Sequence, residues 1–201
     1  SSFKYKGAVA HRQGLGFKGF TEIITTDLLR NRQSTKTFNP QKFGTPVKEV
    51  TPFSETTYNY SVTVDANKKA NISLNLTATK DLLKNTTIAK RYTYDIYKNP
   101  VAEVTQYSDG TSGDAVRTAK EIEYLNIDSN TKFLIGLPKL IKVEDSRGAN
   151  TWTQSQELSY KTGTPLVETI ITKINGYQVE KKEMRYDEYG NVLSEKSAAY
   201  N

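Results

Sequence analysis

The sequence predicts an all-β protein, and three observations carry that prediction. Apolar residues alternate with polar ones, as in the run from Tyr58 to Val64, which places every second side chain on one face of a strand. Tyrosine, which favours strands, occurs 13 times. Short turn-forming sequences separate the alternating runs. We therefore expect mostly antiparallel hairpins in an extended, twisted sheet.

The alternating runs are the predicted strands, and the sequences between them are the predicted turns. Asp-Gly and Asn-Gly supply the positive φ that tight hairpins require. We expect strands over 58–64, 72–77, 167–174 and 177–180, with turns at 65–68, 108–110, 146–148 and 174–176.

Helical spacing is scarce in this sequence. Its best examples are 26–30 and 78–84, each one or two turns long and too short to be stable alone. The stretch 39–46 holds two prolines and a glycine, so we expect it to be irregular. It is either a long connection or a boundary within the chain.

The 201 residues fit one or two domains. Without a Ser/Gly linker after residue 46, we prefer a single continuous β region over 1–201 to two separate domains. The start at Ser1, without a methionine, predicts a processed protein or a fragment of a larger one.

An internal repeat is the most informative feature of the chain. The segment Arg91–Val101 matches Met184–Leu193, and Leu158–Val167 is a weaker third copy in which Lys161 stands in place of an aspartate. In each full copy a tyrosine ends a strand, and the aspartate after it can accept hydrogen bonds from backbone N–H groups further along. Glycine or asparagine then takes a left-handed conformation. The expected turn-defining residues are Tyr94, Asp95, Asn99, Tyr186, Asp187, Gly190 and Asn191.

This Tyr-Asp unit resembles the YD repeat of the Rhs family, which includes the BC shell components of bacterial Tc toxins and, more distantly, the teneurins. Phe133–Val143 resembles the Leu-Gly-Leu-Pro element that precedes a YD strand in those proteins. Tyr5–Ile23 resembles the glycine- and phenylalanine-rich block near the start of their repeat region. Lys98 replaces the usual glycine, which asks a lysine to adopt a positive φ or changes the turn type.

The resemblance implies a non-enzymatic structural module, one section of a β shell wound from an antiparallel sheet. Such a shell scaffolds or encloses a linked polypeptide, a toxin or effector. The implied partners are therefore the rest of the same polypeptide or an encapsulated effector. The implied location is outside the bacterial cell, secreted or at the cell surface.

The composition argues against an enzyme and against a metal site. The chain has no cysteine and a single histidine, His11, so it has no thiolate nucleophile and no cluster of histidine ligands. Glu121 and Glu123 are two residues apart, so on a strand they share one face. Glycosidases use a pair of carboxylates, but these usually come from separate strands across a cleft. We therefore interpret Glu121 and Glu123 as part of a solvated surface. We expect no catalytic residue, no metal and no cofactor.

The net charge of +6 raises nucleic acid as a partner, but the lysines stand singly among polar and acidic residues. Lysines on exposed sheet surfaces also prevent sheets from pairing at their edges, so we expect no nucleic-acid binding. No apolar run is long enough to span a bilayer, and we expect no membrane insertion by this segment. The alternative function is a carbohydrate-binding or adhesive module, with Trp152, Tyr160 and Tyr177 as candidate glycan-stacking aromatics.

Overall fold

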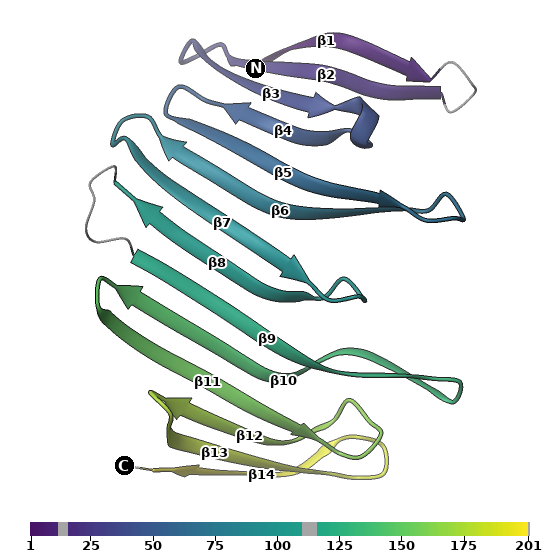
Figure 1. Cartoon of the computed structure of the whole chain (residues 1–201), viewed down its shortest axis with the longest axis vertical. Helices are drawn as coiled ribbons and strands as arrows, with labels where there is room; N and C mark the ends of the chain where they lie inside the picture. The colour runs from purple at the N-terminus through teal and green to yellow at the C-terminus, as the bar shows by residue number, and fades with distance from the viewer. Residues whose placement is uncertain (12–15, 110–115, 201) are drawn as a thin grey trace. The chain divides into compact units, whose positions relative to one another are not determined.

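The computed structural model describes residues 1–11, 16–109 and 116–200. Figure 1 shows these residues as strands joined by short connections. They form two compact units: Ser1–Arg91 with Tyr107–Ser112, and Tyr92–Gln106 with Gly113–Asn201. The prediction of an all-β fold built from antiparallel hairpins is confirmed.

The strands of the first unit pair antiparallel with their neighbours in chain order. They are β1 (Ser2–His11), β2 (Gly16–Asp27), β3 (Arg32–Asn39), β4 (Thr45–Val50), β5 (Ser54–Val64), β6 (Ala70–Asp81) and β7 (Thr86–Tyr94), whose last three residues belong to the second unit.

The second unit follows the same plan, and each strand pairs antiparallel with the next. Its strands are β8 (Pro100–Ser108), β9 (Val116–Ser129), β10 (Lys132–Arg147), β11 (Asn150–Tyr160), β12 (Val167–Ile174), β13 (Tyr177–Tyr186) and β14 (Val192–Ala199). The predicted turns at 146–148 and 174–176 join β10 to β11 and β12 to β13. The predicted turn at 108–110 extends beyond the described residues.

The irregular stretch 39–46 lies within the first unit. It contains a short 3-10 helix, η1 (Pro40–Lys42), whose first turn is capped by the Asn39 side chain. The Asn39 Oδ1 accepts the N–H groups of Gln41 and Lys42, at 3.0 and 3.2 Å. Phe43 then adopts φ 59°, and β4 begins at Thr45. This segment is a structured connection between β3 and β4.

The two short helices considered at 26–30 and 78–84 are not helices. Both are strand ends followed by hairpin turns, β2 to β3 and β6 to β7. The carboxylates of Asp27 and Asp81 each accept the N–H groups of the two residues at the turn tip. Asn31 and Asn85 follow at φ 48° and 54°, a left-handed conformation that sends the chain back into the next strand.

Very little of either unit is buried. Each strand pairs only with its neighbours, so the alternating side chains stand on faces that no second layer of the described chain covers. Most apolar side chains are consequently half-buried by their cross-strand neighbours alone. The buried residues among those described are Ile24, Pro40, Thr45, Ala119 and Thr172.

Candidate functional site

The two YD turns predicted from the sequence have nearly the same geometry. In the first, the Asp95 N–H donates to the Asn99 carbonyl at 3.0 Å, and the Lys98 N–H donates back to the Asp95 carbonyl at 3.1 Å. The Asp95 side chain closes the turn by accepting the Asn99 N–H at 2.8 Å and the Asn99 side-chain amide at 2.9 Å.

The second turn repeats these bonds at Asp187 and Asn191. The Asp187 N–H donates to the Asn191 carbonyl at 3.0 Å, and the Gly190 N–H donates to the Asp187 carbonyl at 3.3 Å. The Asp187 carboxylate accepts the Asn191 N–H at 2.8 Å and its side-chain amide at 2.9 Å. Gly190 has φ 87° where Lys98 has φ 71°. Of the two outcomes expected for Lys98, the lysine has therefore adopted the positive φ and preserved the turn.

Hydrogen bonds hold both aspartates in the charged form. At Asp187 the side-chain amide and then the N–H of Asn191 lower the pKa of the carboxyl group. At Asp95 desolvation acts to raise the pKa, but hydrogen bonds from Asn99 and Asn126 outweigh it and the pKa is lowered. A carboxylate that accepts several N–H groups favours ionisation, so both turns are built around a charged aspartate.

A third turn of this kind occurs at Asp65, where the sequence predicted only a hairpin. The Asp65 N–H donates to the Lys69 carbonyl and the Lys68 N–H donates to the Asp65 carbonyl, both at 3.0 Å. The Asp65 carboxylate accepts the Lys69 N–H at 2.8 Å, and Lys68 has φ 61°. In the sequence, Asp65 is the residue that signals this turn. It was not grouped with the YD units because Val64 stands where those units have tyrosine.

The weaker third copy at Lys161 forms a different turn. Lys161 donates to the Leu166 carbonyl at 2.8 Å, so the loop is one residue longer than in the full copies. In place of an aspartate side chain, the Thr164 hydroxyl donates to the Lys161 carbonyl at 2.9 Å. Gly163 supplies the positive φ, at 71°. The loss of the aspartate thus accompanies a change of loop length.

Tyrosine hydroxyl groups tie neighbouring strands together in the second unit. Tyr160 on β11 donates to the Pro138 carbonyl on β10 at 2.7 Å, and Tyr186 on β13 donates to the Val167 carbonyl on β12 at 2.7 Å. Tyr124 on β9 makes the same type of bond to β8, with the Pro100 carbonyl as acceptor at 3.0 Å. Each bond connects a strand to the one before it; Tyr160 and Tyr186 are the last residues of their strands, whereas Tyr124 lies within β9.

The first YD turn is joined to the Leu-Gly-Leu-Pro element through Asn126. The Asn126 side-chain amide donates to the Asp95 carboxylate at 3.3 Å, and its oxygen accepts the Gly136 N–H at 2.8 Å. Gly136 has φ 79°, and a Cβ added there would lie 3.0 Å from the Asn99 Oδ1. The sequence did not connect Asn126 with the YD turn, because nothing local to it signals a partner 31 positions away.

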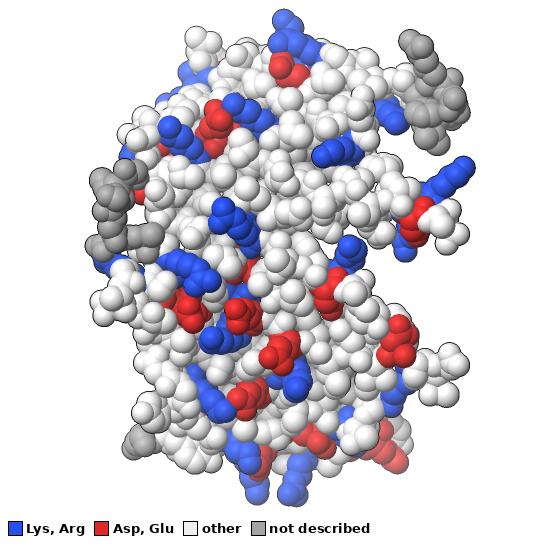
Figure 2. Space-filling view, in the orientation of Figure 1, with Lys and Arg blue, Asp and Glu red and all other residues white. Residues whose placement is uncertain are grey.

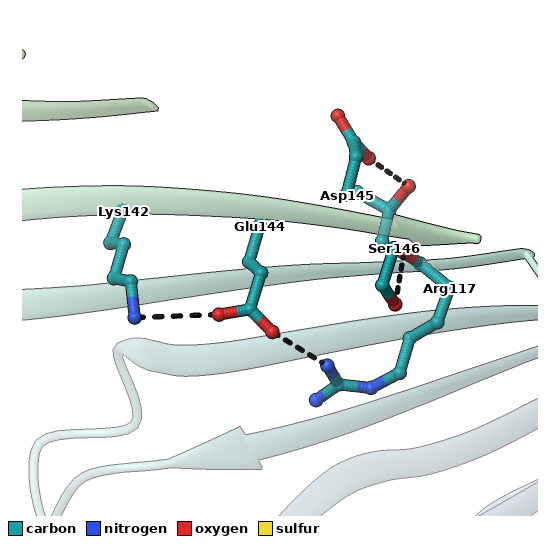
Figure 3. Close-up of polar contacts among 6 residues, drawn as sticks. Arg117, Lys142, Glu144, Asp145 and Ser146 are labelled. Carbon is teal, nitrogen blue, oxygen red and sulfur yellow. Dashed lines mark hydrogen bonds and ion pairs between the residues drawn. The ribbon is translucent and has the colours of Figure 1, made fainter. Parts of the chain in front are cut away.

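One face of β9 and β10 carries a charged group of three side chains, shown in Figure 3. The Glu144 carboxylate pairs with the Arg117 guanidinium at 3.2 Å and with the Lys142 ammonium at 3.6 Å. Asp145 leaves the strand on the opposite side and accepts the Thr118 hydroxyl at 2.5 Å. Pairs of this kind, open to solvent, contribute little to stability and are typical of a hydrated sheet surface.

Basic and acidic side chains are intermixed on the face shown in Figure 2. Cross-strand ion pairs such as Lys36–Glu49 and Lys173–Glu157 join basic and acidic side chains of neighbouring strands. A nucleic-acid interface needs a basic patch of one sign, and this face offers none.

The candidate glycan-stacking aromatics differ in their surroundings. Tyr177 is 78% exposed and Trp152 is 39% exposed. The two lie on one face of the sheet. Ile174 on β12 pairs with Tyr177 on β13 and with Gln154 on β11, and paired residues point to the same face. Trp152 is two residues from Gln154 on β11, so it shares that face. Tyr160 is half-buried, with its hydroxyl engaged by Pro138. The structure thus brings Trp152 and Tyr177 to one face and places Tyr160 in a structural bond.

The described residues include no group of three or more histidine, cysteine, aspartate or glutamate side chains arranged to hold a metal ion. They also include no helix long and apolar enough to cross a membrane. The glycine-rich block resembling the start of the repeat region lies partly outside the described residues, at 12–15. Within its described part, Tyr5, Phe17 and Phe20 form an aromatic cluster with ring centroids 4.8 and 5.1 Å apart.

No family model and no curated protein sequence matches the chain. Its fold is shared by solved structures, among them two crystal structures that contain TcdB2 and TccC3. The structure of TcdB2-TccC3-Cdc42 superposes with a TM-score of 0.61 at 7% sequence identity, over 94% of this chain and 15% of that chain. The structure of TcdB2-TccC3 has the same TM-score and coverage at 8% identity. The antiparallel fold is therefore that of these Tc-toxin components, and this chain spans about a seventh of their length.

Proposed function

We propose that this chain is a non-enzymatic structural module that forms part of a β shell of the kind built by Rhs/YD-repeat proteins, and that the shell scaffolds or encloses a linked polypeptide. The observation that carries the proposal is an antiparallel sheet with almost no buried side chains, on a fold shared with Tc-toxin components. The YD turns and tyrosine bonds fix the hairpins. The faces are left for other parts of a larger assembly to cover.

The exposed area supports this proposal. The accessible surface is 13887 Å² for a 22.6 kDa chain. Two separate compact domains of half that mass would together expose only about 11,500 Å². An excess of this size is expected for a sheet that is completed by further polypeptide.

The proposed partners are the rest of the same polypeptide and a linked effector. The neighbouring crystal structures are themselves assemblies, of TcdB2 with TccC3 and, in one case, with Cdc42. By analogy, we place this chain in a protein that a bacterium secretes or displays at its surface. The YD turns at Asp95 and Asp187 would hold successive hairpins of the shell wall in register.

The proposal can be tested on the full-length protein that contains this chain. Electron cryomicroscopy should show a hollow particle in which residues 1–201 are part of the wall, and the enclosed polypeptide should resist trypsin. The double variant Asp95→Ala/Asp187→Ala should make that polypeptide sensitive to trypsin, whereas the exposed-site variant Tyr189→Ala should not. A particle in which this segment projects as a detached domain would contradict the proposal.

A glycan-binding module is the second candidate function, favoured by the exposed Trp152 and Tyr177 on one face. Aromatic rings presented on a flat polar sheet stack well on sugar rings. A glycan array probed with the wild-type chain tests this candidate. Binding that is lost in Trp152→Ala and Tyr177→Ala, but kept in Tyr189→Ala, would support it. An array with no bound glycan would eliminate it.

A further inference from the structure

Two turns of the first unit have the same sequence pattern and the same structure. Asp27–Asn31 and Asp81–Asn85 both read Asp-Leu-Leu-basic-Asn. In the first turn the Asp27 Oδ1 accepts the N–H groups of Leu29 and Arg30 at 3.0 and 3.3 Å. In the second, the Asp81 Oδ1 accepts those of Leu83 and Lys84 at 2.8 and 3.0 Å. Aspartate and asparagine make the turn, so its backbone does not require the leucines.

The four leucines of these turns are nevertheless among the exposed apolar residues of the chain. Leu28 is 66% exposed, Leu29 94%, Leu82 45% and Leu83 74%. Turn tips usually carry polar residues, because leucine exposed there gains nothing for the isolated fold. Contiguous apolar patches of a few hundred Å² on a protein surface usually mark an interaction site.

Phe53 connects the two leucine turns. It lies in the intervening turn between β4 and β5, and its carbonyl accepts the Leu82 N–H at 2.8 Å. The Arg32 guanidinium, at the start of β3, lies 4.7 Å from the centre of the Phe53 ring. All three turns are at the same ends of their strands, on the left of Figure 1. We call this surface the leucine rim; it consists of Leu28, Leu29, Phe53, Leu82 and Leu83.

We propose that the leucine rim binds the leucine rim of a second copy of this chain, through a two-fold axis perpendicular to the sheet at the Phe53 turn. Neighbouring strands are about 4.8 Å apart, so the three turns follow one another at intervals of about 10 Å. The axis brings the Leu28–Leu29 turn against the Leu82–Leu83 turn of the second copy. Phe53 meets Phe53 of the second copy at the centre.

The charges of the two turns favour this axis. In each turn the acid ends the incoming strand and the base lies in the turn, nearer to the outgoing strand; in the first turn Arg30 also pairs with Asp27 at 3.1 Å. An axis perpendicular to the sheet reverses the order of the partner's turns, so Asp27 faces Lys84 of the second copy and Arg30 faces Asp81 of the second copy. An axis along the rim would instead place Asp27 opposite Asp27 and Arg30 opposite Arg30. Opposite charges across an interface fix its register.

The size of the rim fits a contact between two copies. Its five side chains expose roughly 600 Å² of largely apolar surface, against about 800 Å² per partner in a standard interface. A lipid bilayer fits the charges less well. Each leucine turn carries one acidic and one basic side chain, so Arg32 beside Phe53 adds only a single unbalanced positive charge with which to attract anionic headgroups.

Sedimentation velocity on the purified chain is the first test. We expect a species of twice 22.6 kDa at tens of micromolar, and the monomer alone in the double variant Leu29→Ser/Leu83→Ser. The matched control Ile96→Ser/Tyr189→Ser changes two equally exposed residues in the YD turns and should still dimerise. A monomeric wild-type chain, or a control variant that dissociates as well, would overturn the proposal.

Disulfide trapping tests the axis, because the chain has no cysteine of its own. The variants Leu29→Cys and Leu83→Cys, mixed and mildly oxidised, should form the mixed disulfide in preference to either homodimer. Predominant cross-linking of the Leu29→Cys variant to itself would overturn the proposed axis. Flotation with phosphatidylcholine/phosphatidylserine vesicles completes the test. If the wild-type monomer binds these vesicles and the Leu29→Ser/Leu83→Ser variant does not, the rim binds lipid and the proposal is overturned.

Discussion

The backbone N–H of Gly136 donates a 2.8 Å hydrogen bond to the side-chain oxygen of Asn126. The same asparagine donates its amide to Asp95, so one side chain joins the Leu-Gly-Leu-Pro element to the first YD turn. Glycine is needed at position 136 for two reasons: its φ is 79°, and a side chain there would lie 3.0 Å from the Asn99 Oδ1. The motif and the turn are thus parts of one local structure.

Replacing Gly136 should therefore destabilise the second unit. We expect Gly136→Ala to lower the free energy of unfolding by about 1–3 kcal/mol, since it combines the cost of a positive φ with a close contact. Urea denaturation followed by circular dichroism measures the change. Gly176→Ala is the matched control, because Gly176 has φ 85° but nothing within 4 Å of an added Cβ. An equal loss in the two variants would show that the contact with Asn99 is unimportant.

Acid should weaken the YD turns. Hydrogen bonds from Asn191 lower the pKa of Asp187 in the folded chain, so folding favours the charged form. The resulting stability is present above the unfolded pKa of about 3.9 and is lost as the pH falls through the lower folded value. We expect urea midpoints to decrease between about pH 5 and pH 2, and to decrease less in Asp187→Asn. Glu188→Gln removes the same charge from the same turn while leaving the Asp187 carboxylate in place, and is the matched control.

The tyrosine bonds between strands should contribute measurably to stability. Tyr160→Phe and Tyr186→Phe each leave a half-buried carbonyl without its hydroxyl donor, and each should lower the free energy of unfolding by about 0.5–1.5 kcal/mol. Thermal unfolding of the variants measures the loss. Tyr189→Phe and Tyr177→Phe change exposed tyrosines and should unfold like the wild type. If all four variants behave alike, the hydroxyl bonds have no structural role.

Local patterns predicted the strands and the YD turns because the groups involved are close in sequence. Alternation identifies a strand directly, and an aspartate four residues before an asparagine contains the whole turn at Asp95. The hairpin predicted at 65–68 is confirmed, but its likeness to the YD turns was missed, because Val64 and Lys69 stand where the YD unit has tyrosine and asparagine. The segments 26–30 and 78–84, judged too short to be stable helices, are hairpin turns that the carboxylates of Asp27 and Asp81 close.

Relationships between distant residues had no signal in one sequence. Asn126 joins Gly136 on β10 to Asp95 in the turn between β7 and β8, and only the register of β9 with β10 brings it to Gly136. The near absence of a core was equally hidden. Alternation shows that one face of each strand is apolar, but it does not show what covers that face. Here the described chain provides no covering layer, which is the property that supports the shell proposal.

The lysine at position 98 gives the last prediction, because it occupies a conformation that glycine adopts more easily. Lys98 has φ 71°, and Gly190 holds the equivalent place in the second YD turn at φ 87°. A left-handed conformation costs an ordinary residue about 1 kcal/mol, so Lys98→Gly should stabilise the chain by up to that amount. Chemical denaturation measures the gain, and Lys90→Gly, in the middle of β7, should instead destabilise the chain. A loss of stability in Lys98→Gly would mean that the lysine side chain contributes more than its backbone conformation costs.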